Sequence, residues 1–184
     1  CALPICIFYD KNRSLDITTS VTGTFTTEGW SVYKYTNMRS DGQPGSNTTF
    51  PDTDFPMFRL ADVYLMYAEA VARGGQGGSM ATAVQYINAL RQRAYGDTFH
   101  GINEAWLREN NFRNILDERQ RELYWEGTRR TDLIRYGLFT SGNYLWTFKG
   151  GVLGGVGVNG RYNVFPIPTT DLSVNGNLKQ NEGY

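Results

Sequence analysis

The segment from residue 115 to residue 137 constrains the fold of this chain more than any other, because it places charges on an apolar helical face. At 100° per residue, that face carries the apolar residues Phe112, Ile115, Leu116 and Leu123. The same face carries the charged residues Arg119, Glu122 and Glu126. Burying a charge is costly unless it finds a partner, so the pattern predicts a set of ion pairs inside the core.

We expect this ionic core to lie between three packed helices. Arg91 and Arg119 are predicted to pair with Glu69, Glu122 and Glu126, because a guanidinium group suits bidentate contact with carboxylates. On this interpretation the five residues are structural and hold the helices together.

The alternative is catalytic. Glu118 and Glu122 are one helical turn apart, and a glycoside hydrolase needs two carboxylates about 5 to 10 Å apart. However, the arginines nearby would keep both carboxylates charged, whereas a glycosidase needs one of them as a protonated acid. The pattern therefore favours the structural role, and no catalytic residue is predicted.

Two further helices are predicted upstream. Residues 57–73 are apolar nearly all round, which is typical of a helix buried on several sides. The glycine-rich stretch 74–78 ends this helix, and Ser79 is the expected N-cap of a second helix that runs to about Ala94. The two would form an antiparallel hairpin that resembles one tetratricopeptide unit.

The rest of the chain is predicted to be mostly irregular. Residues 103–109 suggest a helical turn, residues 112–126 the charged helix, and a short helix ends at Tyr136. Residues 150–160 are glycine-rich loop, and no regular helix is expected after Gly137. The predicted fold is mainly α with long irregular loops, divided into a lead-in segment (1–56) and a helical region with a loop-rich tail (57–184).

Composition excludes some functions and permits others. The chain has 18 basic and 18 acidic side chains, so it lacks the basic excess that nucleic-acid binding requires. It also contains twelve Tyr and four Trp, and aromatic rings can stack on sugars as well as pack in a core. Trp30, Tyr144 and Trp146 are the candidate carbohydrate contacts. His100 has no metal-ligand neighbours in the sequence, so no metal or cofactor is predicted.

Four motifs, in order, resemble the C-terminal part of the SusD/RagB family. They are Phe58-Arg-Leu-Ala-Asp-Val-Tyr-Leu-Met-Tyr-Ala-Glu-Ala70, the charged segment 115–137, Tyr144-Leu-Trp-Thr-Phe-Lys-Gly-Gly151, and Phe165-Pro-Ile-Pro168 with the tail 177–184. The resemblance covers about residues 30 to 184. Family members are longer, so it implies an incomplete fragment of a SusD/RagB-like fold that lacks the N-terminal portion.

The resemblance also implies a function. Members of this family are lipoproteins on the outer membrane that bind glycans and pass them to a SusC-like TonB-dependent porin. We therefore expect non-catalytic binding of an oligosaccharide or polysaccharide at the cell surface. The alternative is a structural or porin-docking part that makes no glycan contact, and a glycoside hydrolase is a distant third.

The membrane anchor implied by the family is not expected in this chain. Cys1 occupies the position that is lipidated in mature lipoproteins, but the lipidated residue should open the N-terminal region that the motifs place before this chain. We therefore interpret the Cys1–Cys6 segment as a truncation end, and expect membrane attachment only through an anchor missing from these residues.

Overall fold

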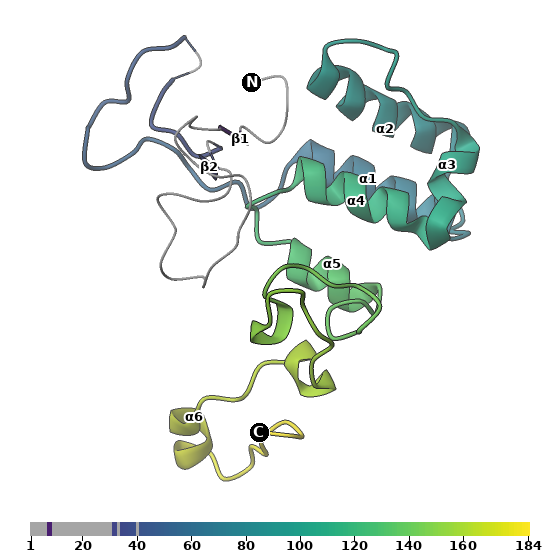
Figure 1. Cartoon of the computed structure of the whole chain (residues 1–184). Coiled ribbons are helices and arrows are strands. Elements are labelled where there is room, and N and C mark those ends of the chain that lie inside the picture. The colour runs from purple at the N-terminus through teal and green to yellow at the C-terminus, as the bar shows by residue number, and fades with distance from the viewer. Residues whose placement is uncertain (1–6, 9–30, 33, 40) are drawn as a thin grey trace. The chain divides into compact units, whose positions relative to one another are not determined.

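The computed structural model describes residues 7–8, 31–32, 34–39 and 41–184, and over these the regular structure is mainly helical, as predicted. The α-helices of the described residues are α1 (Leu60–Ala72), α2 (Met80–Tyr95), α3 (Glu104–Arg108), α4 (Arg113–Glu122), α5 (Arg129–Arg135) and α6 (Thr169–Val174) (Figure 1). Short 3-10 turns occur at η1 (Glu109–Phe112), η2 (Lys149–Gly151) and η3 (Gly160–Asn163). Two short strands, β1 (Ile7–Phe8) and β2 (Ser31–Val32), pair antiparallel, with Ile7 opposite Val32.

The chain forms two compact units, which we describe separately. Among the described residues, unit 1 holds the strands and α1 to α4 and ends at Arg129, and unit 2 holds residues 130–184. The boundary predicted after residue 56 stays a prediction.

Helices α1 and α2 form the predicted hairpin. The Ser79 side chain accepts a hydrogen bond from the Thr82 amide at 3.1 Å, which confirms it as the N-cap of α2. The Tyr64 and Tyr86 rings stack face to face, with centroids 4.1 Å apart. The hairpin is thus fixed by a cap at its turn and by ring packing between its helices.

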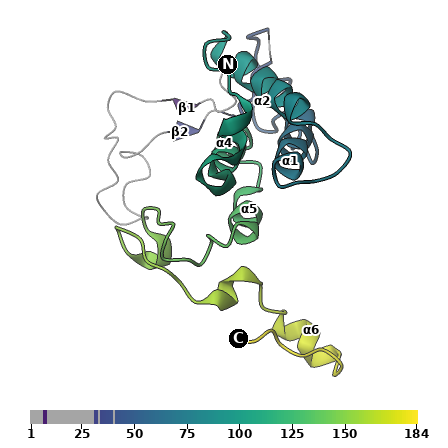
Figure 2. The same cartoon turned by 90° about the vertical axis from the view of Figure 1, so that its right-hand side faces the viewer.

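The core of unit 1 lies where α1, α2, α3 and α4 meet, and Figures 1 and 2 show α1 running beside both α2 and α4. Its largest fully buried members are Leu65, Ile87, Leu107 and Ile115, contributed by α1, α2, α3 and α4 in turn. Each such side chain stabilises the fold by about 1.5–3 kcal/mol relative to an exposed one. The four helices therefore depend on one shared core.

The structure corrects three predicted helix boundaries. Helix α1 begins at Leu60 rather than Met57, because Arg59 is extended with φ −148°. Helix α4 begins after Phe112, whose φ is +64°, and ends at Glu122 rather than Glu126. Helix α6 lies in the tail where no regular helix was expected, directly after the backbone restricted by Pro168.

No helix in the part of the chain that the structure describes has the length and apolar character needed to cross a bilayer.

Candidate functional site

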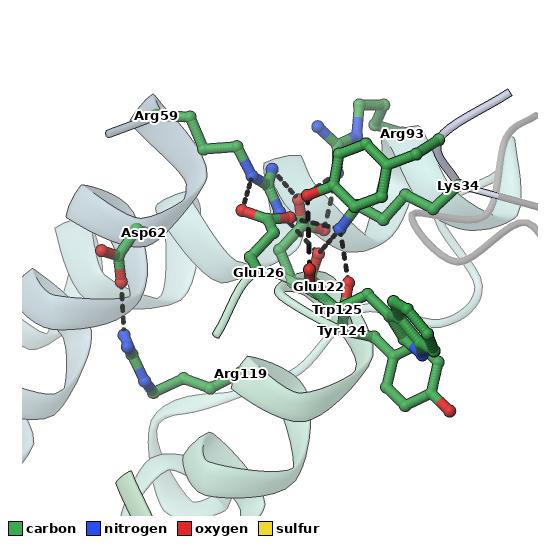
Figure 3. Close-up of polar contacts among 10 residues, drawn as sticks. Lys34, Arg59, Asp62, Arg93, Arg119, Glu122, Tyr124, Trp125 and Glu126 are labelled. Carbon is green, nitrogen blue, oxygen red and sulfur yellow. Dashed lines mark hydrogen bonds and ion pairs between the residues drawn. The ribbon is translucent and has the colours of Figure 1, made fainter. Parts of the chain in front are cut away.

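The C-terminal end of α4 carries a cluster of charges around the buried carboxylates of Glu122 and Glu126, and its cations come from three other segments of unit 1. We call Lys34, Arg59, Arg93, Glu122 and Glu126 the ionic cluster (Figure 3). Arg59 binds both carboxylates, with its Nε 2.7 Å from Glu126 Oε2 and its Nη1 bonded to Glu122 Oε1. Arg93 donates to both Glu122 oxygens at 2.6 Å, and Lys34 pairs with Glu126. The cluster joins the lead-in segment, the start of α1 and the end of α2 to α4.

The same cations also end helix α4. Lys34 Nζ donates to the carbonyl oxygens of Glu122 and Tyr124 at 3.3 and 2.9 Å, and Arg59 donates to the Glu122 carbonyl at 2.5 Å. The last carbonyls of a helix lack amide donors, and cations near them also oppose the helix dipole favourably. Side-chain donors therefore form hydrogen bonds with these carbonyls. The helix ends before Leu123, and the backbone then turns at Trp125, whose φ is +64°.

The ionic cluster shifts two pKa values. Burial alone would raise the pKa of Glu126, but hydrogen bonds from Arg59 and Lys34 outweigh it and hold the pKa below its ordinary value. Burial alone would likewise lower the pKa of Arg59, but its hydrogen bonds to Glu126 and Glu122 raise it. Both groups are thus stabilised in their charged forms.

Three more ion pairs involve residues of α4. Arg119 Nη1 donates to Asp62 Oδ1 of α1 at 2.8 Å, and Figure 3 shows this contact apart from the ionic cluster. Glu118, which is buried, accepts from Arg91 of α2 and from Arg121, each at 2.7 Å. Charged contacts therefore bridge α4 to both helices of the hairpin.

Of the five residues predicted to form the ionic core, Glu69, Arg119 and Glu122 are buried, and the contacts of Arg91, Arg119 and Glu69 include partners that the sequence did not suggest. Arg91 binds Glu118 rather than a predicted carboxylate, Arg119 donates to Asp62, and Glu69 accepts at 2.8 Å from Arg73, the C-cap residue of α1. Helical spacing identifies which residues face the core, but the pairing depends on the packing of the helices.

Several members of these pairs escaped the sequence analysis. Lys34 and Arg93 lie outside the α4 pattern, and nothing in their local sequence marks them. Arg59 and Asp62 do stand on the narrow charged stripe of 57–73. That stripe was the one signal that could have found them.

Unit 2 contains a pocket of about 600 Å³ with aromatic walls. Its aromatic lining residues are Phe139, Trp146, Tyr162, Phe165 and Tyr184. Arg130 also lines it: its guanidinium lies 4.0 Å from the Phe165 ring centroid and donates to the Tyr162 carbonyl at 2.7 Å. Asn159 lines it as well, and its side-chain Oδ1 accepts a hydrogen bond from the Arg161 amide at 2.9 Å. The pocket therefore combines exposed rings with polar groups, which suits an uncharged polar ligand with apolar faces.

Lys149 fixes the loop that carries Trp146. Its side chain is buried, and its ammonium donates to the carbonyls of Leu138, Ser141 and Tyr144 at 3.3, 2.5 and 2.6 Å. Three donors thus meet three acceptors. The ammonium also lies 4.5 Å from the Trp146 ring centroid. Burial lowers the pKa of Lys149.

Two glycines let the same loop close. Gly155 has φ +76°, and a Cβ there would lie 2.5 Å from the Trp146 carbonyl oxygen. Gly150 has φ +66°, and its Cβ would lie 2.6 Å from a Val156 methyl group. Side chains at these positions would collide with the loop as well as strain the backbone.

The predicted carbohydrate contacts have different outcomes. Trp30 lies outside the described residues. Trp146 is 38% exposed and lines the pocket, with its ring centroid 6.2 Å from that of Phe139. Tyr144 tilts against Trp146 at a centroid distance of 6.4 Å. Their role in binding stays a prediction.

Comparison with known proteins identifies the family to which this chain belongs. The SusD family model matches residues 11–184, so the chain belongs to the SusD family. It is 47% identical to the starch-binding protein SusD of Bacteroides thetaiotaomicron over 158 residues, which are 86% of this chain and 26% of that protein. It is 33% identical to a SusD-like protein of Formosa agariphila, covering 95% of this chain and 32% of that protein.

Solved structures agree with this assignment. The surface glycan-binding protein A from Bacteroides thetaiotaomicron matches with a TM-score of 0.62 and 25% identity, covering 86% of this chain and 31% of that one. A SusD homolog from the same organism matches with a TM-score of 0.54 and 28% identity, over 77% of this chain and 32% of that one. The SusD-like helical fold is thereby confirmed, and the chain spans about a quarter to a third of its curated relatives.

We predict that Glu122→Gln destabilises unit 1 by about 2 to 4 kcal/mol, because it leaves Arg59 and Arg93 without a full counter-charge where Glu122 is buried. Urea unfolding followed by circular dichroism measures the change. Glu104→Gln, at an exposed position on α3, is the matched control and should cost less than about 0.5 kcal/mol. Equal effects of the two substitutions would contradict a structural role for the cluster.

The lowered pKa of Glu126 predicts a specific pH dependence. A carboxyl whose folded pKa is lowered contributes stability that is present above its unfolded pKa of about 4.3 and is lost as the pH falls through the folded pKa. The difference in unfolding free energy between wild type and Glu126→Gln should therefore shrink as the pH falls below about 4. Urea titrations from pH 7 to pH 3 test this, and a constant difference would argue against it.

We predict that Lys149→Met loosens the loop from residue 138 to residue 149, because it leaves the Leu138, Ser141 and Tyr144 carbonyls without their donor. Each unsatisfied buried acceptor costs about 1–3 kcal/mol. Peptide-level hydrogen exchange should show faster exchange in this loop. The exposed Lys179→Met provides the matched control. Unchanged exchange in the Lys149 variant would mean that the ammonium does not hold the loop.

Proposed function

We propose that this protein binds an oligosaccharide or polysaccharide at the cell surface without chemical conversion. Two observations support this. The chain belongs to the SusD family, and the relatives named above are described as a starch-binding protein and a surface glycan-binding protein. The observation within this chain that carries the proposal is the aromatic pocket of unit 2 around Trp146.

Ring stacking and hydroxyl hydrogen bonds would supply the affinity. A pyranose presents C–H groups on its faces and hydroxyls at its rim. The exposed Trp146 ring offers an apolar face to such a sugar, with Tyr144 set at 58° against it. Asn159 also lines the pocket; its Oδ1 is bonded to the Arg161 amide, and its side-chain NH2 group is of a type that can donate to a hydroxyl. Such a site binds without a nucleophile or an acid.

The carboxylates of α4 are better explained by a structural role than by a role in glycoside hydrolysis. Glu118 and Glu122 are both buried, and each already binds two arginine side chains. Neither lines the pocket of unit 2. We therefore assign them to the scaffold and propose no glycoside hydrolase activity.

Delivery is the second part of the proposal. By its family, the protein would sit at the outer membrane as a surface-exposed lipoprotein and pass its glycan to a SusC-like TonB-dependent porin. The alternative is that this part of the protein only supports the fold or contacts the porin, while glycan contacts lie elsewhere. The match covers only 26% of the starch-binding relative, so most of that protein lies outside it. This is the reason to retain the supporting or docking role as an alternative.

Affinity electrophoresis of the chain through gels that contain amylopectin or another soluble polysaccharide tests direct binding. Trp146→Ala should weaken retardation about tenfold, equivalent to a loss of ~1.4 kcal/mol of stacking. Trp125→Ala removes an exposed tryptophan of unit 1 and should leave retardation unchanged. If no glycan retards the wild type, the supporting or docking role is favoured, and release of reducing sugar would instead indicate a hydrolase.

A further inference from the structure

The last residues of unit 2 are bonded to the segment that precedes α6. We call residues 177–184 the C-terminal strap. The Gln180 side chain meets Ile167 twice, because its Oε1 accepts from the Ile167 amide at 2.8 Å and its Nε2 donates to the Ile167 carbonyl at 2.9 Å. The Asn181 side chain donates to the Phe165 carbonyl at 2.7 Å. Two amide side chains thus supply hydrogen bonds that a neighbouring strand would otherwise give this backbone.

The strap carries one residue of the pocket wall. Tyr184 lines the pocket, and its hydroxyl lies 3.0 Å from the Val164 carbonyl oxygen and 3.2 Å from that of Arg161. The preceding Gly183 has φ +89°, and a Cβ there would lie 3.1 Å from the Arg161 Cβ. Glycine therefore lets the strap approach Arg161 closely. The backbone on which the strap lies thus holds the Tyr184 ring at the pocket.

The backbone under the strap belongs to the pocket as well. Tyr162, Val164 and Phe165 all line it. The Phe165 side chain is 70% exposed, so its ring is available to a ligand. Asn181 bonds the carbonyl of this same residue. The strap therefore both places Tyr184 and fixes the backbone of Phe165, and these two rings belong to the aromatic lining of the pocket.

Few contacts hold the strap in place. None of its residues is buried, and only Gln180 and Asn181 are half-buried. Its docking therefore depends on side-chain hydrogen bonds rather than on an apolar core. Segments of this kind lie at the low-stability end of a fold, where one substitution or a ligand can change the docked fraction.

We propose that Gln180 and Asn181 are positioning residues of the pocket in unit 2. They bond the backbone of Ile167 and Phe165, and so hold Tyr184 and Phe165 as an aromatic wall for the sugar. The inference rests on the proposed function, since it concerns the same pocket. Sugar binds the docked strap, so the apparent affinity falls with the docked fraction. By linkage, bound sugar in turn stabilises the docked strap.

Affinity electrophoresis through gels that contain amylopectin measures binding. Gln180→Ala should weaken retardation at least about tenfold, because loss of both bonds to Ile167 lowers the docked fraction. Asn177→Ala is the matched control in the same strap. Its side chain is exposed and forms no hydrogen bond with another described residue, so retardation should be unchanged.

The outcomes separate this inference from the proposed function. If Trp146→Ala weakens retardation and Gln180→Ala does not, the pocket binds sugar without help from the strap, and only the inference is wrong. A wild type that amylopectin does not retard would contradict the proposed function, and the inference with it.

Peptide-level hydrogen exchange distinguishes positioning from a merely structural role. Pro166 and Pro168 carry no amide hydrogen, so Ile167 is the reporter between them. Gln180→Ala should speed exchange of the Ile167 amide at least about tenfold, because that amide loses its acceptor. In the wild type, amylopectin should slow the same exchange. Equal wild-type rates with and without amylopectin would overturn the inference.

A second variant guards against loss of the fold. Circular dichroism checks that Gln180→Ala keeps the helix content of the wild type. Tyr184→Phe removes only the hydroxyl and keeps the ring, so it should speed Ile167 exchange and weaken retardation even if Gln180→Ala does not fold. Faster exchange with full retardation in this variant would show that binding does not need the docked strap.

Discussion

The contact between Arg59 and the two carboxylates at the end of α4 organises unit 1. Arg59 stands just before α1, so its bonds to Glu122 and Glu126 tie the entry of the first helix to the exit of the fourth. The same guanidinium also donates a hydrogen bond to the backbone carbonyl of Glu122. One side chain thus joins two helices and ends one of them. Arg93 and Lys34 complete the arrangement from the end of α2 and from the lead-in segment.

Buried charge has a second consequence for this chain. Asp62 of α1 is paired with Arg119 of α4, whereas the exposed positions of α1 include the apolar residues Leu60, Val63 and Met66. An ion pair between helices is specific in position and in partner, whereas an apolar face accepts any complementary surface. The internal pairs therefore fix the arrangement of the hairpin and α4.

Unit 2 uses charge differently. There Lys149 binds backbone carbonyls, and Arg130 lies on aromatic rings. A loop-rich segment has few backbone hydrogen bonds of its own, so long cationic side chains supply donors that helices or strands would provide elsewhere. These contacts fix the conformation of a glycine-rich region and position Trp146 at the pocket. The proposed ligand contact thus depends on a buried lysine that lies beside the Trp146 ring and lines the same pocket.

The sequence by itself determined the burial of Ile115, Leu116, Arg119 and Glu122 in α4, though not that of Glu118. It also determined the Ser79 cap and the α1–α2 hairpin, because these follow from helical periodicity and local hydrogen bonding. It also identified the family through its motifs. It could not assign Arg91 to Glu118, or bring Lys34 to Glu126, because these partners are separated by many residues. Only the tertiary structure decided those pairings and the early end of α4, since both depend on which side chains the packed helices bring within hydrogen-bonding distance.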